Sequence, residues 1–157
     1  MFKDGDIEGI VIKKLVQYND ARGWLMELFR HDELEERYHP AMTYLSLTRP
    51  GVARGPHEHI DQADYFCFAG PSDFKVYLWD NRPESLTYKN RTTIVAGVSN
   101  PVAIIVPRNV VHAYKNVGDA DGLVVNCPNR LFKGEGKKEP VDEVRYEDDH
   151  ASPYILD

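Results

Sequence analysis

Hydrophobic and polar residues along this chain alternate in short runs rather than at helical spacing. Successive side chains of a strand point to opposite faces, so a period of two is typical of a half-buried strand. Gly, Pro, Asn and Asp residues, which favour turns, separate the runs. The pattern predicts nine strands, over residues 10–16, 24–30, 42–48, 65–69, 74–80, 86–95, 102–106, 111–116 and 123–127.

Only one segment has the pattern of a helix. Residues 32–38 are rich in charged helix formers, and Pro40 ends that segment. The Gly- and Lys-rich residues 133–138 indicate an exposed loop, whereas order resumes over residues 142–149. No internal repeat interrupts the chain. We therefore expect one all-β domain over residues 1–157, a sandwich or jelly-roll barrel with one short helix.

Composition narrows the class of protein. An apolar content of 42% in 157 residues fits a single domain with a proper core. The net charge of -6 argues against nucleic acid as a partner, since a phosphate backbone requires a basic stripe. No apolar run approaches a membrane span and no signal peptide is evident, so we expect a cytoplasmic protein without a membrane partner. Cys67 and Cys127 are expected to be reduced core thiols.

Histidine alternation marks a candidate site. His57 and His59 are two residues apart, which places both imidazoles on one face of a strand. Asp64 follows shortly, and His112 closes a second stretch that begins at Pro107. The two stretches resemble the conserved motifs of the cupin superfamily, with Asp64 in place of the usual Glu and Asn109 in place of the usual Gly. The resemblance implies a cupin-type jelly-roll β-barrel with these side chains in its interior.

Four ordered stretches extend the resemblance to one family, the dTDP-4-dehydrorhamnose 3,5-epimerases. Residues 20–27 are similar to its D-x-R-G-x-x-x-E, residues 51–57 to G-V-x-R-G-L-H, and residues 80–87 to D-x-R-x-x-S-P-T. Residues 106–114 are similar to I-P-x-G-F-A-H-G-F, and a tail at residues 144–148 is similar to I-x-W-x-D. Four ordered matches are far more specific than any one of them.

The resemblance implies an isomerase that moves protons on a nucleotide-linked 4-keto-6-deoxy sugar in deoxysugar and polysaccharide biosynthesis. A proton next to a ketone leaves when a base takes it and the enolate oxygen is stabilised. The match makes His57 the base, Asp148 its orienting partner and His112 a support on the oxyanion side. It assigns the binding of the nucleotide and its diphosphate to Arg22, Glu27 and Arg54, with Trp24 beside the nucleotide. No metal or other cofactor enters this scheme.

The same resemblance implies a homodimer. Members of the family exchange an N-terminal strand between subunits, and residues 7–16 form an apolar β segment suited to that role. Arg22 would then be lent across the subunit interface. The nucleotide sugar is the one further partner that we expect.

Several positions depart from the family pattern. The family's enolate-stabilising Lys falls at Asp64, its Gln two residues after the base is His59, and no Tyr occupies residues 124–126. The segment from Arg54 to His59 is also similar to the R-G-x-H-x-H of sugar nucleotide 3,4-ketoisomerases, which use two histidines and a tyrosine on the preceding strand, here Tyr44. We interpret the chain as an epimerase or isomerase that acts at a single carbon.

A metal-binding cupin is the alternative from another class. His57, His59, Asp64 and His112 supply the imidazoles and carboxylate that suit a divalent transition metal. Such a protein could be an enzyme or a binding module.

Less specific interpretations compete with some of these assignments. Asp148 lies in the run Glu147-Asp148-Asp149, which is also typical of a solvated face. Asp80 and Arg82 fit an ion pair at the end of a strand, and Trp24 and Trp79 fit the core.

Overall fold

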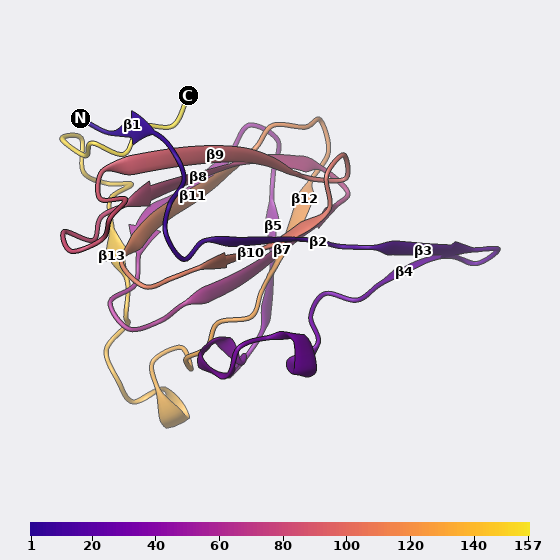
Figure 1. The fold of residues 1–157 in the computed structure, drawn as a ribbon. Coiled ribbons are helices and arrows are strands. Elements are labelled where there is room, and N and C mark those ends of the chain that lie inside the picture. The colour runs from indigo at the N-terminus through magenta and orange to yellow at the C-terminus, as the bar shows by residue number, and fades with distance from the viewer.

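Two β-sheets packed face to face make up the body of the protein (Figure 1). The structure is a computed structural model that describes residues 1–157. A six-stranded sheet has the order β1-β9-β8-β11-β6-β13, and a five-stranded sheet has the order β2-β10-β7-β12-β5. The expected all-β jelly-roll fold is confirmed. The strands are β1 (Lys3–Asp4), β2 (Val11–Lys14), β3 (Gln17–Asp20), β4 (Gly23–Met26), β5 (Tyr44–Thr48), β6 (Ala53–Glu58), β7 (Asp64–Gly70), β8 (Asp73–Asp80), β9 (Asn90–Gly97), β10 (Val102–Val106), β11 (Val110–Asn116), β12 (Gly122–Asn126) and β13 (Val144–Arg145).

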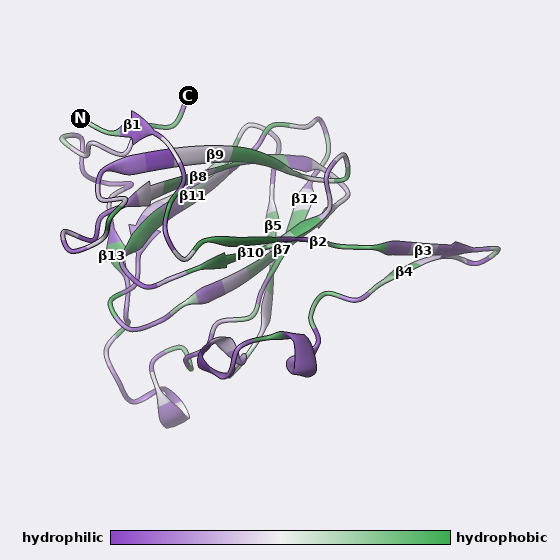
Figure 2. Ribbon diagram, viewed as in Figure 1, coloured by the Kyte–Doolittle hydropathy of each residue, from purple (hydrophilic) through white to green (hydrophobic).

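The main core lies between the two sheets. Strand β10 contributes Val102, Ile104 and Val106 to it, while Ala103 and Ile105 on the other face pack under the segment that follows β2. This burial on both faces explains why β10 is one continuous apolar run (Figure 2). Tyr154, in the C-terminal segment, packs against the outer face of the six-stranded sheet. Each sheet therefore also has side chains packed against its outer face.

Three predicted elements differ from the structure. Residues 32–38 form no α-helix but two short 3₁₀ helices, η1 (His31–Glu33) and η2 (Glu36–Tyr38); a third, η3 (Glu135–Lys137), lies in the predicted 133–138 loop. A seven-residue segment is too short to offset helix nucleation. Of residues 24–30 only the first part is a strand, and the strand predicted to begin at residue 86 begins at Asn90. Strand β6 was not among the predicted strands, because its residues include Arg, Gly and Pro and do not alternate between apolar and polar.

A hairpin of β3 and β4 extends away from the two sheets (Figure 1). Its apolar side chains are open to solvent, with Trp24 57% and Leu25 63% exposed, so the prediction of a core position for Trp24 was wrong. Trp79 is buried, as expected. Strand β2, within the 7–16 segment that we expected to be exchanged, pairs with β10 of its own chain. The unpartnered N-terminal element is therefore the hairpin.

The turn after β8 has a structural role. Asp80 is fully buried and accepts hydrogen bonds from Arg82, Ser85 and Thr87. The expected ion pair of Asp80 with Arg82 is confirmed at 2.8 Å. No helix of the chain has the length and apolar character needed to cross a membrane.

Candidate active site

The pairing of β6 with β11 brings three imidazoles together. His57 and His112 are cross-strand partners with ring centroids 4.5 Å apart, and the His59 ring lies 5.8 Å from that of His57 and 5.7 Å from that of His112. Gly55 allows this close approach, because a Cβ there would lie 2.6 Å from the His112 carbonyl oxygen and 3.0 Å from His57 Nδ1. The structure thus groups the histidines that the sequence singled out.

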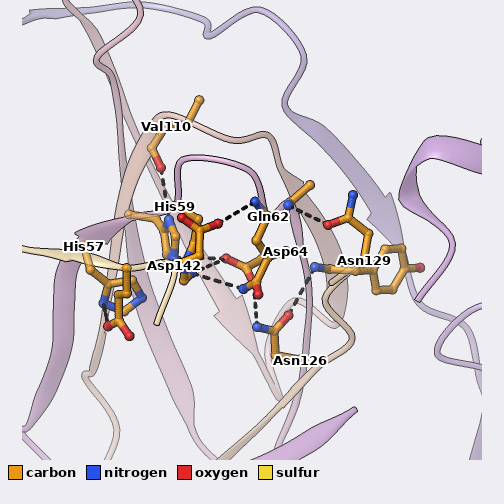
Figure 3. A network of polar contacts seen from close by, with 12 residues as sticks. His57, His59, Gln62, Asp64, Val110, Asn126, Asn129 and Asp142 are labelled. Carbon is orange, nitrogen blue, oxygen red and sulfur yellow. Dashed lines mark hydrogen bonds and ion pairs between the residues drawn. The ribbon is translucent and has the colours of Figure 1, made fainter. Parts of the chain in front are cut away.

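Asp64 lies beside the histidines and is buried (Figure 3). Its Oδ1 accepts hydrogen bonds from the side-chain amides of Gln62, at 2.9 Å, and Asn126, at 2.8 Å. Its Oδ2 lies 3.2 Å from His59 Nε2 and 3.3 Å from His112 Nε2. No Lys or Arg pairs with Asp64, so the imidazoles are the groups able to balance its buried charge.

Backbone carbonyls fix the orientation of two of the rings. The Nδ1 of His59 meets the Asp142 carbonyl, and the Nδ1 of His112 lies 3.1 Å from the Val110 carbonyl. Because a carbonyl accepts, each Nδ1 carries a proton and each Nε2 is directed at Asp64. The Asp142 carboxylate in turn accepts the backbone N–H groups of residues 60, 61 and 62, each at 2.9 Å. Asp142 therefore clamps the loop that carries His59, a role with no signal in the sequence.

Burial and neighbouring charge separate the protonation behaviour of the histidines. Burial, together with the nearby His112 and His59, lowers the pKa of His57 well below its ordinary value, so this ring is neutral at pH 7. Burial opposes the charged form of His59 as well, but the hydrogen bond and charge of Asp64 outweigh it and raise its pKa to about 9. Although burial disfavours its ionised form, contact with His59 keeps the pKa of Asp64 below its usual range. A neutral imidazole and an ion pair thus lie side by side.

The acidic partner of His57 is Glu143 and not the expected Asp148. Strand β13 pairs with β6 so that Arg145 faces His57, which brings Glu143 Oε1 to 3.7 Å from His57 Nδ1. Asp148 lies beyond this strand, exposed, with no ion pair to a histidine. Residues 147–149 are all exposed, so Asp148 fits the interpretation of this run as a solvated face. The pairing joins segments about ninety residues apart, so no local pattern could reveal Glu143.

His112 does not reach the substrate side of the site. Its ring is 2% exposed, and its Nε2 is buried against Asp64 without a hydrogen-bond partner. The ring packs edge-on against that of His57. This geometry suits a residue that holds the His57 ring in place, and not the contact with a substrate oxygen that the resemblance implied.

Tyr44 borders an open cleft of about 1040 Å³, together with His59, Gln62, Asp142 and Glu143. It is the cross-strand partner of Asn126, whose side-chain amide donates a hydrogen bond of 2.8 Å to the Tyr44 hydroxyl. The cleft is large enough for a sugar and part of its nucleotide.

The predicted substrate-binding residues fall into two groups. Arg54, on β6, is exposed and donates to Thr48 Oγ1 at 2.9 Å and to the Leu47 carbonyl at 2.8 Å. Arg22, Trp24 and Glu27 lie on or just after the β3–β4 hairpin, where Arg22 pairs with Asp20 and Glu27 with Arg30. Within one chain the structure therefore does not bring these three residues to the histidines.

The three imidazoles also have a geometry that a metal ion could use. Each of His57, His59 and His112 offers a nitrogen within 4.8 Å of the others, and the carbonyl contacts of His59 and His112 are those that orient metal-bound histidines. Asp64 does not belong to this set, and Glu143 and Glu147 form a second one with His57. The residues fit a metal held by three nitrogens.

Comparisons with known proteins identify the family and the fold of this chain. The sequence model of the dTDP-4-dehydrorhamnose 3,5-epimerase family matches residues 4–149. The probable low-salt glycan biosynthesis epimerase Agl13 of Haloferax volcanii is 35% identical over 85% of this chain and 86% of its own. The spore coat polysaccharide biosynthesis protein SpsL of Bacillus subtilis is 34% identical over 76% of this chain and 78% of its own. A solved dTDP sugar isomerase from Desulfovibrio desulfuricans has the same fold, with a TM-score of 0.79 and 21% identity over 92% of this chain and 87% of its own.

Proposed function

The chain belongs to the dTDP-4-dehydrorhamnose 3,5-epimerase family, and from that premise we propose that it epimerises one carbon next to the ketone of a dTDP-linked 4-keto-6-deoxy sugar. The observation that carries this proposal is the neutral, partly exposed His57, which lies beside the His59–Asp64 ion pair and against Glu143, a residue of the cleft wall. The biosynthesis of a surface glycan or polysaccharide is the process in which such a sugar is used. Two buried thiols, Cys67 and Cys127, are both free and fit the cytoplasmic location that we propose.

Proton removal from the sugar is the task of His57. A buried imidazole that stays neutral can accept a proton at pH 7, and the carboxylate of Glu143 stabilises the imidazolium that forms. The enolate oxygen then requires positive charge. His59 is more exposed than Asp64, so the positive end of this pair is directed toward the cleft.

Substrate binding would combine two arginines. Arg54 is exposed on β6, the strand that carries His57, and its guanidinium can pair with a diphosphate through two parallel hydrogen bonds. Arg22 is too far away within its own chain, because it lies in the turn of the hairpin (Figure 1). A second subunit could supply it.

We therefore propose that the protein is a homodimer and that the hairpin reaches the partner. The hairpin exposes Tyr18, Trp24 and Leu25, and strand β5, an edge of its sheet, exposes Leu45 and Leu47. Unpaired edges and exposed apolar side chains are features that a second copy would cover.

Light scattering is expected to give twice the chain mass of 18.0 kDa at micromolar concentration. Replacing Trp24 and Leu25 by glutamate should yield monomers with little activity, since apolar contact area is lost and Arg22 is withdrawn. Leu86→Glu is the matched control, because Leu86 is 95% exposed on a different loop. A monomeric wild-type protein would refute the proposal.

Two other activities suit the same residues. A metal held by His57, His59 and His112 would act as a Lewis acid on a carbonyl oxygen, while Glu143 would orient His57. A 3,4-ketoisomerase would move the ketone instead of inverting a carbon, using His59 and Tyr44 of the cleft wall together with the neighbouring His57. The metal-free epimerase requires no group beyond the chain, and we favour it for that reason.

One experiment separates these possibilities. Chelator-treated protein is incubated with dTDP-4-keto-6-deoxyglucose in D2O, and the ring protons are followed by NMR. We expect deuterium at one carbon beside the ketone and the signals of the epimer. A shifted ketone would identify the ketoisomerase, and turnover that depends on added Mn²⁺, Fe²⁺ or Zn²⁺ would identify the metal enzyme. Absence of exchange under all these conditions would refute the proposed function.

A further inference from the structure

Gln62 lies in the loop between β6 and β7, in the wall of the cleft that also contains His59 and Tyr44. Its backbone N–H donates to the Asp142 carboxylate at 2.9 Å, and its side-chain Nε2 donates to Asp64 Oδ1 at the same distance (Figure 3). A free glutamine side chain samples many rotamers. Because it is held at both ends, Gln62 has its conformation fixed before any ligand binds.

The neighbours of the Gln62 amide determine which way it points. Asp64 is ionised beside His59, so its oxygens only accept hydrogen bonds. The reverse orientation of the amide would place two acceptor oxygens 2.9 Å apart, so the nitrogen is the atom that faces Asp64. The same nitrogen lies 3.2 Å from His59 Nε2, and the two nitrogens are directed at different oxygens of one carboxylate. The carbonyl oxygen Oε1 therefore lies on the side of the amide away from Asp64.

This Oε1 is an acceptor without a partner in the chain. The hydrogen bonds of Gln62 use its backbone N–H and its Nε2, and none reaches Oε1. The polar side-chain atoms that are both buried and unpartnered belong to Glu58, Asp64, Asn90 and His112, so solvent reaches Gln62 Oε1. An acceptor that is fixed in place, open to a cleft and free of protein donors suits a ligand that supplies a donor.

We propose that Gln62 is a specificity-determining residue, whose Oε1 accepts a hydrogen bond from the 3-hydroxyl of the 4-keto sugar. The inference rests on the proposed function and assigns one further contact with its substrate. A hydroxyl is the matching group because it donates. The ketone and the diphosphate carry acceptors only, so neither matches Oε1.

The contact with His59 selects this hydroxyl among those of the sugar. In the proposed reaction the charged His59 faces the oxygen on C4, where the enolate charge forms. The Gln62 amide lies 3.2 Å from His59 Nε2, so it reaches a group next to C4. Of the two neighbouring carbons, C3 carries a hydroxyl, whereas C5 carries a methyl group and the ring oxygen, which cannot donate.

Substrate analogues test this contact in combination with Gln62→Met. The measured quantity is kcat/KM for deuterium exchange next to the ketone, with dTDP-4-keto-6-deoxyglucose and with its 3-deoxy analogue. The ratio of the two values should be about tenfold larger in the wild type than in Gln62→Met, because methionine has a similar length and no carbonyl acceptor. Comparing ratios cancels the effect of the missing hydroxyl on the acidity of the sugar. The corresponding ratio for the 2-deoxy analogue should be the same in both proteins.

Asn126→Leu is the matched control. Asn126 donates to the same Oδ1 of Asp64, at 2.8 Å, so its removal weakens the support of that carboxylate as Gln62→Met does. Its own Oδ1 already accepts the backbone N–H of Tyr65. This variant should therefore slow exchange of both sugars by the same factor and keep the wild-type ratio. Circular dichroism and the melting temperature establish that each variant is folded, and the 2-deoxy comparison decides the matter without Asn126→Leu.

Three results would overturn the inference. The first is an equal 3-deoxy ratio in the wild type and in Gln62→Met, and the second is a change confined to the 2-deoxy ratio. The third is the same change of ratio in Asn126→Leu, because the effect would then come from Asp64. A wild-type protein that exchanges no ring proton of any of the three sugars refutes the proposed function itself, so the two failures are distinguishable.

Discussion

Replacing His57 by alanine should lower both epimer formation and deuterium exchange at the substrate carbon by about 10² to 10⁴, since a positioned base contributes this much to proton transfer. Burial keeps the pKa of His57 low, so the base is already deprotonated in the resting protein. Turnover should therefore persist below pH 6.5, where an ordinary histidine would already be protonated.

Binding should survive this change. Arg54 is bonded to Thr48 and Leu47 and not to His57, so the affinity for dTDP, measured by calorimetry, should remain within about threefold of the wild-type value. His150→Ala is the control, because His150 is exposed and remote from the cleft. A His57→Ala variant that exchanges protons within tenfold of the wild-type rate would exclude His57 as the base.

The partner of His57 can be identified in the same assay. Glu143→Gln removes the charge that stabilises the imidazolium and should slow exchange, whereas Asp148→Asn should have no effect. The reverse order would restore the assignment to Asp148 and require the C-terminal segment to rearrange when substrate binds.

The sequence was sufficient for the fold and for part of the site. Alternating apolar residues located most strands, and the two-residue spacing of His57 and His59 placed both rings together even though β6 ends at Glu58. Asn109, which stands where the cupin motif has Gly, lies in a turn. Its φ of 58° is one that Asn tolerates better than most residues, and its N–H donates to the His59 carbonyl at 2.8 Å.

The rest depends on pairings between distant segments. Glu143 and Asp142 reach the histidines only because β13 joins β6, and two-residue strands carry no periodicity. Asn126 offered no signal of its own, because its task is set by the register of β12 against β5 and β7. Trp24 was misassigned because composition cannot tell an aromatic side chain of the core from an exposed one.

Asp64→Asn tests the charge beneath the site. We expect NMR of chelator-treated protein to give a His59 pKa of about 9 in the wild type and one below 6.5 in the variant, because burial is then the largest remaining influence on that ring. Turnover should fall as well, by up to about 10², since the cleft loses the positive end of the pair.

The stability of the folded protein should decrease as the pH rises. The pKa of His59 is raised on folding, so its contribution is complete below pH 6.5 and is lost as the pH rises through about 9. A shift of this size corresponds to about 3 kcal/mol in the free energy of unfolding. The free energy of unfolding of the wild type, measured with urea, should therefore fall between these pH values. That of Asp64→Asn should be lower than the wild-type value at pH 6 and nearly independent of pH over this range.

The control for this change is Asp61→Asn. Asp61 pairs with Arg130 at 2.9 Å, but both side chains are more than half exposed, so water screens the pair and its removal should cost under about 1 kcal/mol at every pH. If the His59 pKa were the same in wild type and Asp64→Asn, Asp64 would not hold the proton. The buried carboxylate would then be balanced through His112, the other imidazole that faces its Oδ2, and the positive charge would lie away from the cleft.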